Sequence, residues 1–165
     1  GLPHWCVSIA LERNNEVIAG VVHDPVKNEI FWAEKGLGAM LNNRRIQVAA
    51  RKNLTDALIS TAVTPNLQAG IDNLVKAGAT IRSYGSACLD LCYVAAGRFD
   101  GYFEDALKAW DKAAGTLIVR EAKGIVSELN GAGNVLTGHG TLAANATLHG
   151  DILRAIAPVR AAAGL

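Results

Sequence analysis

The hydrophobic pattern of this chain changes near residue 50, and that change constrains the fold more than any other feature. Before it, short apolar segments at 5–11, 17–22 and 29–33 are separated by turns. Hairpin-linked segments of this kind are typical of an antiparallel meander. After about residue 54, segments with strand and helix periodicity alternate. The sequence therefore predicts an α/β fold, a layered sandwich in which a meander precedes an alternating half.

The alternating half is predicted in more detail. Its strands are predicted at 57–61, 80–84, 99–103 and about 141–144. Its helices are predicted at 67–77, 87–96, 111–122 and 147–156.

The composition is that of a globular domain. Of the 165 residues, 50% are hydrophobic and 19% are charged, which excludes a disordered chain. The formal net charge of +1 gives no sign of a nucleic-acid-binding surface. No apolar run approaches the ~20 residues of a membrane span. Cys6, Cys88 and Cys92 form neither an even set nor a metal-binding spacing, so we expect reduced thiols and a cytoplasmic location.

Three short segments place polar groups where predicted strands end and predicted helices begin. Asp111 follows Trp110 in the first turn of a predicted helix. Glu104 ends the strand upstream, and Gly85-Ser86-Ala87 forms a strand-to-helix junction with Ser86 at the N-cap. The free N–H groups of helix starts suit anions and oxygen-rich ligands. These segments could enclose one polar site, in which Asp111 would hold a divalent cation.

Each of these residues also has a purely structural explanation. Asp111 could cap its helix, and Glu104 could be a solvated acid at a strand end. Gly85 to Ala87 could be a turn followed by an N-cap. Asp90 is interpreted as a helix-surface residue or a packing partner rather than a catalyst. The residues alone leave these alternatives open.

Residues 110–115 (Trp-Asp-Lys-Ala-Ala-Gly), 95–101 (Ala-Ala-Gly-Arg-Phe-Asp-Gly) and 85–90 are similar to the second signature of a known family, the magnesium-dependent inositol monophosphatases. Residues 1–10 resemble the segment that follows its first metal motif, and 20–25 and 34–39 resemble its hairpin and turn sequences. Their common order and spacing make the resemblance specific over nearly the whole chain. It implies the family's αβαβα fold, Mg²⁺ as cofactor, a phosphomonoesterase activity and a homodimer.

The resemblance also implies roles for the candidate residues. Asp111 becomes the catalytic residue of this chain, a metal ligand on the leaving-group side that also contacts the sugar. Glu104 accepts hydrogen bonds from substrate hydroxyls, and the backbone of Gly85, Ser86 and Ala87 orients the polyol. The substrate implied first is myo-inositol 1-phosphate, hydrolysed to inositol and phosphate by metal-activated water.

One signature of the family does not occur in these residues. It is the run Asp-Pro-Xaa-Asp-Gly-Thr, and Asp24-Pro25 is followed instead by Val26-Lys27-Asn28. We therefore expect the chain to be the C-terminal part of a longer enzyme, or a sequence from which residues are absent, and to be inactive alone. Residues 1–50 would be the remnant of an N-terminal antiparallel sheet domain, and residues 51–165 a C-terminal α/β domain.

Two other functions remain open. Another phosphatase of the same fold, such as a fructose bisphosphatase or a bisphosphate nucleotidase, would differ in its substrate-contacting loops, and the compact Gly-Ser-Ala junction favours the inositol branch. Some bacterial relatives act instead as extragenic suppressors through the transcription machinery or RNA. The near-neutral charge argues weakly against direct RNA contact. The basic cluster of Arg44-Arg45 and Arg51-Lys52 could serve such a partner, although a solvated face is the simpler explanation.

Overall fold

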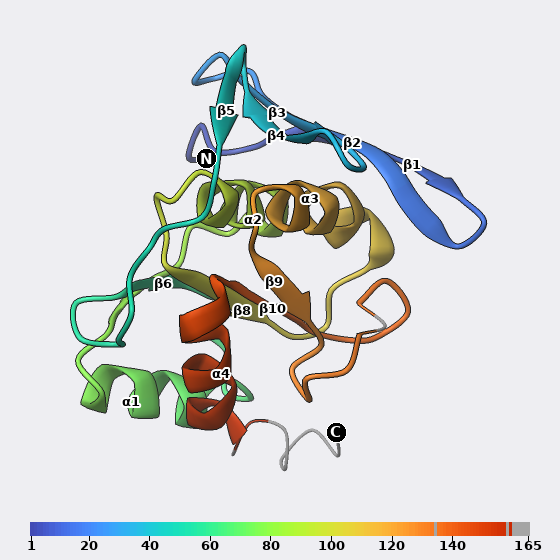
Figure 1. The fold of residues 1–165 in the computed structure, drawn as a ribbon. Coiled ribbons are helices and arrows are strands. Elements are labelled where there is room, and N and C mark those ends of the chain that lie inside the picture. The colour runs from blue at the N-terminus through green and yellow to red at the C-terminus, as the bar shows by residue number, and fades with distance from the viewer. Residues whose placement is uncertain (134, 158, 160–165) are drawn as a thin grey trace.

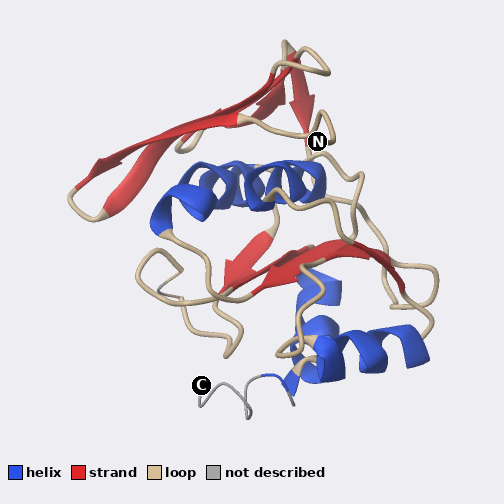
Figure 2. Cartoon of the chain, turned by 180° about the vertical axis from the view of Figure 1, so that it is seen from behind, coloured by secondary structure: helices blue, strands red, loops and turns tan. Residues whose placement is uncertain are grey.

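The computed structural model describes residues 1–133, 135–157 and 159, and within them the chain forms two five-stranded sheets and four helices. The elements form layers. The first sheet, one pair of helices, the second sheet and another pair of helices follow one another (Figures 1 and 2). This architecture confirms the predicted α/β layered sandwich.

The first sheet is an antiparallel meander in which each strand pairs with the next. Its strands are β1 (Val7–Arg13), β2 (Glu16–Asp24), β3 (Glu29–Glu34), β4 (Gly38–Leu41) and β5 (Arg44–Ile46). Asn14 and Asn15 have φ values of 54° and 61°, the left-handed backbone that joins β1 to β2 in a tight hairpin. β1 to β3 confirm the predicted meander. β4 and β5 were not predicted, because they are short and Gly36 and Gly38 give that region the character of a turn.

The second sheet is mixed. Its strands are β6 (Leu58–Ser60), β7 (Thr80–Arg82), β8 (Gly101–Glu104), β9 (Ile125–Ser127) and β10 (Thr141–Ala144), in the spatial order β7-β6-β8-β10-β9. β6 pairs in parallel with β7 and β8, whereas β10 is antiparallel to β8 and β9. The predicted strands correspond to β6, β7, β8 and β10, and β9 was missed.

Two pairs of helices cover the second sheet. The helices are α1 (Gln68–Lys76), α2 (Ala87–Ala95), α3 (Ala109–Glu121) and α4 (Ala146–Ala155). Figure 1 shows α2 and α3 between the two sheets and α1 and α4 on the outer face of the second. α2 is buried all along from Leu89 to Ala95, as expected for a helix covered on every side. None of the helices in the described ranges has the length and apolar character that a membrane crossing requires.

The first sheet lies directly on α3. A Cβ added to Gly20 of β2 would be 2.9 Å from the Cα of Ala114 in α3, so the glycine allows the two backbones to approach. On the other side of α3, Lys112 reaches the loop before β10. α3 therefore fixes both sheets relative to one another, and its N-terminal end carries Asp111.

Candidate active site

The starts of α2 and α3 lie side by side. The thiol of Cys88, in the first turn of α2, donates a hydrogen bond to the carbonyl oxygen of Asp111, at 3.1 Å. Asp111 is in the first turn of α3, as predicted. Glu104, at the end of β8, is close enough to Asp111 for its ionisation to depend on the Asp111 charge. Two helix starts and one strand end thus meet at the same place in the fold.

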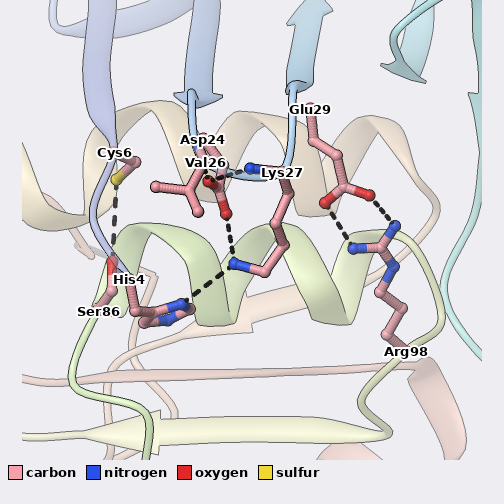
Figure 3. Close-up of polar contacts among 8 residues, drawn as sticks. All are labelled: His4, Cys6, Asp24, Val26, Lys27, Glu29, Ser86 and Arg98. Carbon is pink, nitrogen blue, oxygen red and sulfur yellow. Dashed lines mark hydrogen bonds and ion pairs between the residues drawn. The ribbon is translucent and has the colours of Figure 1, made fainter. Parts of the chain in front are cut away.

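The Gly85-Ser86-Ala87 junction has the predicted backbone but not the expected capping bond. Gly85 has φ +80°, and no atom lies within 4 Å of a Cβ added there, so the left-handed backbone rather than crowding calls for glycine. Ser86 occupies the N-cap position of α2 with φ −141°. Within the described residues its hydroxyl caps no N–H group of the helix, and lies 3.8 Å from Cys6 Sγ instead (Figure 3).

Asp111 does cap its own helix. The backbone N–H of Lys108 donates to Asp111 Oδ2 at 2.9 Å, and the N–H of Asp111 donates to the Lys108 carbonyl at 3.0 Å. The structural explanation given for this residue is therefore correct. A carboxylate offers about four lone-pair sites on two oxygens, so the capping bond leaves it able to bind a cation as well.

Glu104 is half-buried and has a partner of its own. The hydroxyl of Tyr102 donates to Glu104 Oε2 at 2.9 Å. Burial raises the pKa of the Glu104 carboxyl, the Tyr102 hydrogen bond opposes this shift, and the charges of Asp105 and Asp111 add to it. Glu104 is thus held in place by Tyr102 in a region of negative potential, rather than freely solvated at a strand end.

Asp90 adds a buried acid to the same region. It is 1% exposed, so it is a packing partner and not a helix-surface residue. Burial raises the pKa of Asp90 to about 7, the charge of Glu104 adds to this shift, and the nearby Ser60 side chain opposes it. A carboxyl group whose pKa is raised by a neighbouring carboxylate marks a place where a cation would be stabilised.

The acids present fit a divalent cation as a partial ligand set. Asp111 supplies a half-buried carboxylate of the hard oxygen type that Mg²⁺ prefers, and the neighbouring acids supply negative potential. Across residues 1–133, 135–157 and 159, however, no three His, Cys, Asp or Glu side chains are arranged to hold a metal ion together. The described residues therefore offer one metal-binding carboxylate rather than a complete site.

A buried lysine next to Asp111 was missed by the sequence reasoning. Lys112 is fully buried, and its Nζ donates to the carbonyls of Gly138 and Gly140 at 2.7 and 3.4 Å. It also lies 3.7 Å from Glu128 Oε1. Burial lowers the pKa of Lys112 and the Glu128 carboxylate opposes the shift. The signal in the sequence is a lysine followed directly by the small residues Ala113, Ala114 and Gly115.

A cavity of about 850 Å³ lies elsewhere, between the β1–β2 hairpin and the later turns of α3. Its lining includes Val17, Thr116, Leu117 and Arg120, and none of the five candidate residues. The candidate residues therefore lie outside this cavity.

Comparison with known proteins is consistent with this geometry. The model of the inositol monophosphatase family matches residues 1–161. The chain is 45% identical over 165 residues to the Nus factor SuhB of Pasteurella multocida, covering 96% of the chain and 62% of the relative. It is 48% identical over 144 residues to the inositol-1-monophosphatase of Rhizobium meliloti, covering 82% and 54%.

A solved structure agrees with the sequence matches. The extragenic suppressor protein suhB of Bartonella henselae superimposes with a TM-score of 0.90 at 42% identity, covering 93% of the chain and 64% of that protein. This chain thus spans less than two thirds of the length of these relatives. The family match, the identities and the superposition confirm the resemblance, and the chain belongs to the inositol monophosphatase family.

Proposed function

We propose that this chain provides the substrate-binding half of a magnesium-dependent phosphatase that hydrolyses a sugar or polyol phosphate monoester. Membership of the inositol monophosphatase family supports phosphatase activity. One observation supports the roles of particular residues: Asp111, Glu104 and the start of α2 lie together in one acidic region. Myo-inositol 1-phosphate is the first candidate substrate, because one of the relatives carries the name inositol-1-monophosphatase.

Each residue has a role that its position supports. Asp111 would hold Mg²⁺ through the carboxylate that also caps α3. When bound, Mg²⁺ neutralises phosphate charge and activates a water molecule for attack on phosphorus. Glu104, held by Tyr102, would accept hydrogen bonds from the polyol hydroxyls. Gly85, Ser86 and Ala87 would align the polyol ring with their backbone at the open start of α2.

Cation binding is the first test. Calorimetric titration of the chain with Mg²⁺ should show binding that D111N weakens by at least about 10-fold, because a metal-binding oxygen is lost. The control D72N removes an exposed carboxylate on α1 and should bind as the wild type does. Equal affinities of D111N and wild type would refute the role of Asp111.

Turnover is tested with a longer protein. The 165 residues contain no Asp-Pro-Xaa-Asp-Gly-Thr run, so we expect them to release no phosphate alone. The same residues fused to the N-terminal segment of a family member that carries this run should release phosphate with Mg²⁺. A panel of inositol 1-phosphate, fructose 1,6-bisphosphate and a nucleotide bisphosphate then identifies the substrate. Magnesium-dependent turnover by the 165 residues alone would contradict the proposed division of labour.

A role with the transcription machinery is the second candidate function. It is favoured by the 45% identity to a relative named Nus factor SuhB. Capture of RNA polymerase by immobilised wild-type chain and by D111N distinguishes the two functions. Equal capture by both supports an interaction that does not need the metal site, whereas no capture by either supports an enzyme alone.

Two further properties belong with this proposal. We propose a homodimer, which light scattering of the purified chain would detect as a doubled mass. We also propose that residues 1–50 and 51–165 form separate domains. Limited proteolysis should then cut first between them, and initial cleavage inside β2 or α3 would argue against the division.

A further inference from the structure

The cavity beside the later turns of α3 is lined by three parts of the chain that contribute different chemistry. Its volume of about 850 Å³ lies within the range of small-molecule binding sites, roughly 300–1,000 Å³. Val17 comes from the β1–β2 hairpin, Leu117 and Arg120 come from α3, and Val135 and Leu136 come from the loop after β9. Figure 1 shows these three segments at the same end of the molecule. The cavity therefore combines an aliphatic lining with a cationic side chain.

Among the charged residues that line the cavity, Arg120 lacks an ionic partner. Glu16 and Lys35 pair with each other at 2.5 Å, and Glu121 accepts two backbone N–H groups at the β3–β4 turn, at 2.9 and 2.8 Å. In the described part of the chain, the Arg120 guanidinium contacts the carbonyl oxygen of Val126 at 3.5 Å and no carboxylate. A guanidinium carries five N–H donors, so several of them remain for an anion.

A buried hydroxyl lies on the same side of α3 as Arg120. Thr116 precedes Arg120 by one helical turn, which places both on one face of the helix, and it lines the same cavity. Thr116 is 3% exposed, and its hydroxyl has no hydrogen-bond partner within the described ranges. Buried polar groups in native proteins are nearly always hydrogen-bonded, so this hydroxyl remains able to donate to a molecule in the cavity. A hydroxyl and a guanidinium one turn apart suit the two oxygens of a carboxylate.

We propose that this cavity binds a small amphipathic acid, that is, a molecule with one carboxylate and an apolar body. The carboxylate accepts hydrogen bonds from the Arg120 guanidinium and the Thr116 hydroxyl. The apolar body packs against Val17, Leu117 and Val135. Burial of that body supplies affinity, and the charged hydrogen bonds to Arg120 select an acid over a neutral molecule. No part of this inference depends on Mg²⁺ or on the proposed function.

Octanoate is the probe, because it joins a carboxylate to a linear apolar chain. Titration of the isotope-labelled protein with octanoate, without Mg²⁺, should shift the amide resonances of Val17, Thr116, Leu117 and Val135 along one saturable curve. Octanamide has the same chain without the charge and should bind at least about 10-fold more weakly, because hydrogen bonds to charged groups are the stronger ones. Acetate has the charge without the chain and should not saturate the site.

Two variants assign the binding to particular side chains. R120M keeps an apolar stem and removes the charge, so it should weaken octanoate binding by at least about 10-fold. The control R82M removes an exposed arginine of β7 and should bind octanoate as the wild type does. T116V removes only the hydroxyl and should weaken binding by about 3- to 10-fold. T116V should also be at least as stable as the wild type, because that hydroxyl makes no hydrogen bond among the described residues.

Three results would overturn the proposal. In the first, octanamide binds as tightly as octanoate, which would remove the argument for an acid. In the second, R120M and R82M bind octanoate with equal affinity. In the third, the shifted amides belong to β1, where Val7, Ile9 and Leu11 expose apolar side chains, which would mean adsorption to the first sheet. Because the titration contains no Mg²⁺, a failure of the proposed metal site would leave each of these results interpretable.

Discussion

Replacement of Lys112 by methionine should destabilise the fold strongly. Lys112 is fully buried and its ammonium group makes contact with Gly138, Gly140 and Glu128. Glu128 is itself 5% exposed, and its Oε1 has no hydrogen-bond partner among the described residues. K112M would leave the Glu128 carboxylate buried without its cationic partner, next to an uncharged side chain of similar volume. Removal of one partner from a buried ion pair costs about 3–5 kcal/mol, a roughly hundred- to several-thousand-fold shift toward the unfolded state.

Urea unfolding of K112M at neutral pH measures this loss. Far-UV circular dichroism is the better probe, because Trp5, Trp32 and Trp110 are exposed and report poorly on the core. The control K76M removes an exposed lysine in the last turn of α1. Its urea midpoint should equal that of the wild type.

A second substitution tests whether the lost stability comes from the unpaired charge of Glu128. The double variant K112M/E128Q should recover part of the lost stability, because the glutamine can still accept the Gly140 N–H bond without a buried charge. Two results would refute the reasoning: a loss below about 1 kcal/mol in K112M, a typical value for point mutations in general, or no recovery in the double variant. If K112M does not fold, E128Q alone provides a milder comparison.

Three other substitutions test separate parts of the fold. G20V places a side chain 2.9 Å from the Cα of Ala114, so thermal unfolding should show a loss of about 1–3 kcal/mol, whereas G133A, which meets no atom within 4 Å, should be nearly neutral. N145A removes the cap that accepts the N–H groups of Thr147 and Leu148 at 2.9 and 2.8 Å and should cost about 1–2 kcal/mol. The pKa of Asp90 is raised to about 7 in the fold, so the native state keeps a proton that the unfolded state loses from about pH 4. Stability should therefore fall from about pH 4 to 7 in wild type and less in D90N, and equal pH profiles would contradict the burial argument.

The sequence predicted those elements whose signals are local. The strand predicted at about 141–144 is β10, because a threonine and three apolar residues stand between Gly140 and the helix-capping Asn145. β9 was missed, since Ile125–Ser127 is only three residues long and is defined by its pairing with β10. Short strands of this kind depend on a partner that the local pattern does not contain.

The candidate site divides in the same way. The position of Asp111 in the first turn of α3 could be predicted from the small residues that follow it. The buried state of Asp90 could not, because an aspartate normally favours the surface, and Asp90 is 1% exposed. The hydrogen bond between Cys88 and Asp111 joins two different helices. The residue spacing within either helix therefore could not predict it.

The complete burial of α2 has a consequence for how the chain tolerates change. In α1, only Gly70, Ile71 and Leu74 are buried, so a saturation scan of α1 should show tolerant and intolerant positions in the usual helical rhythm. In α2, every position from Leu89 to Ala95 is buried. A saturation scan should therefore find all of these positions intolerant of substitution, without a helical period. Substitutions should therefore accumulate far more readily in α1 than in α2.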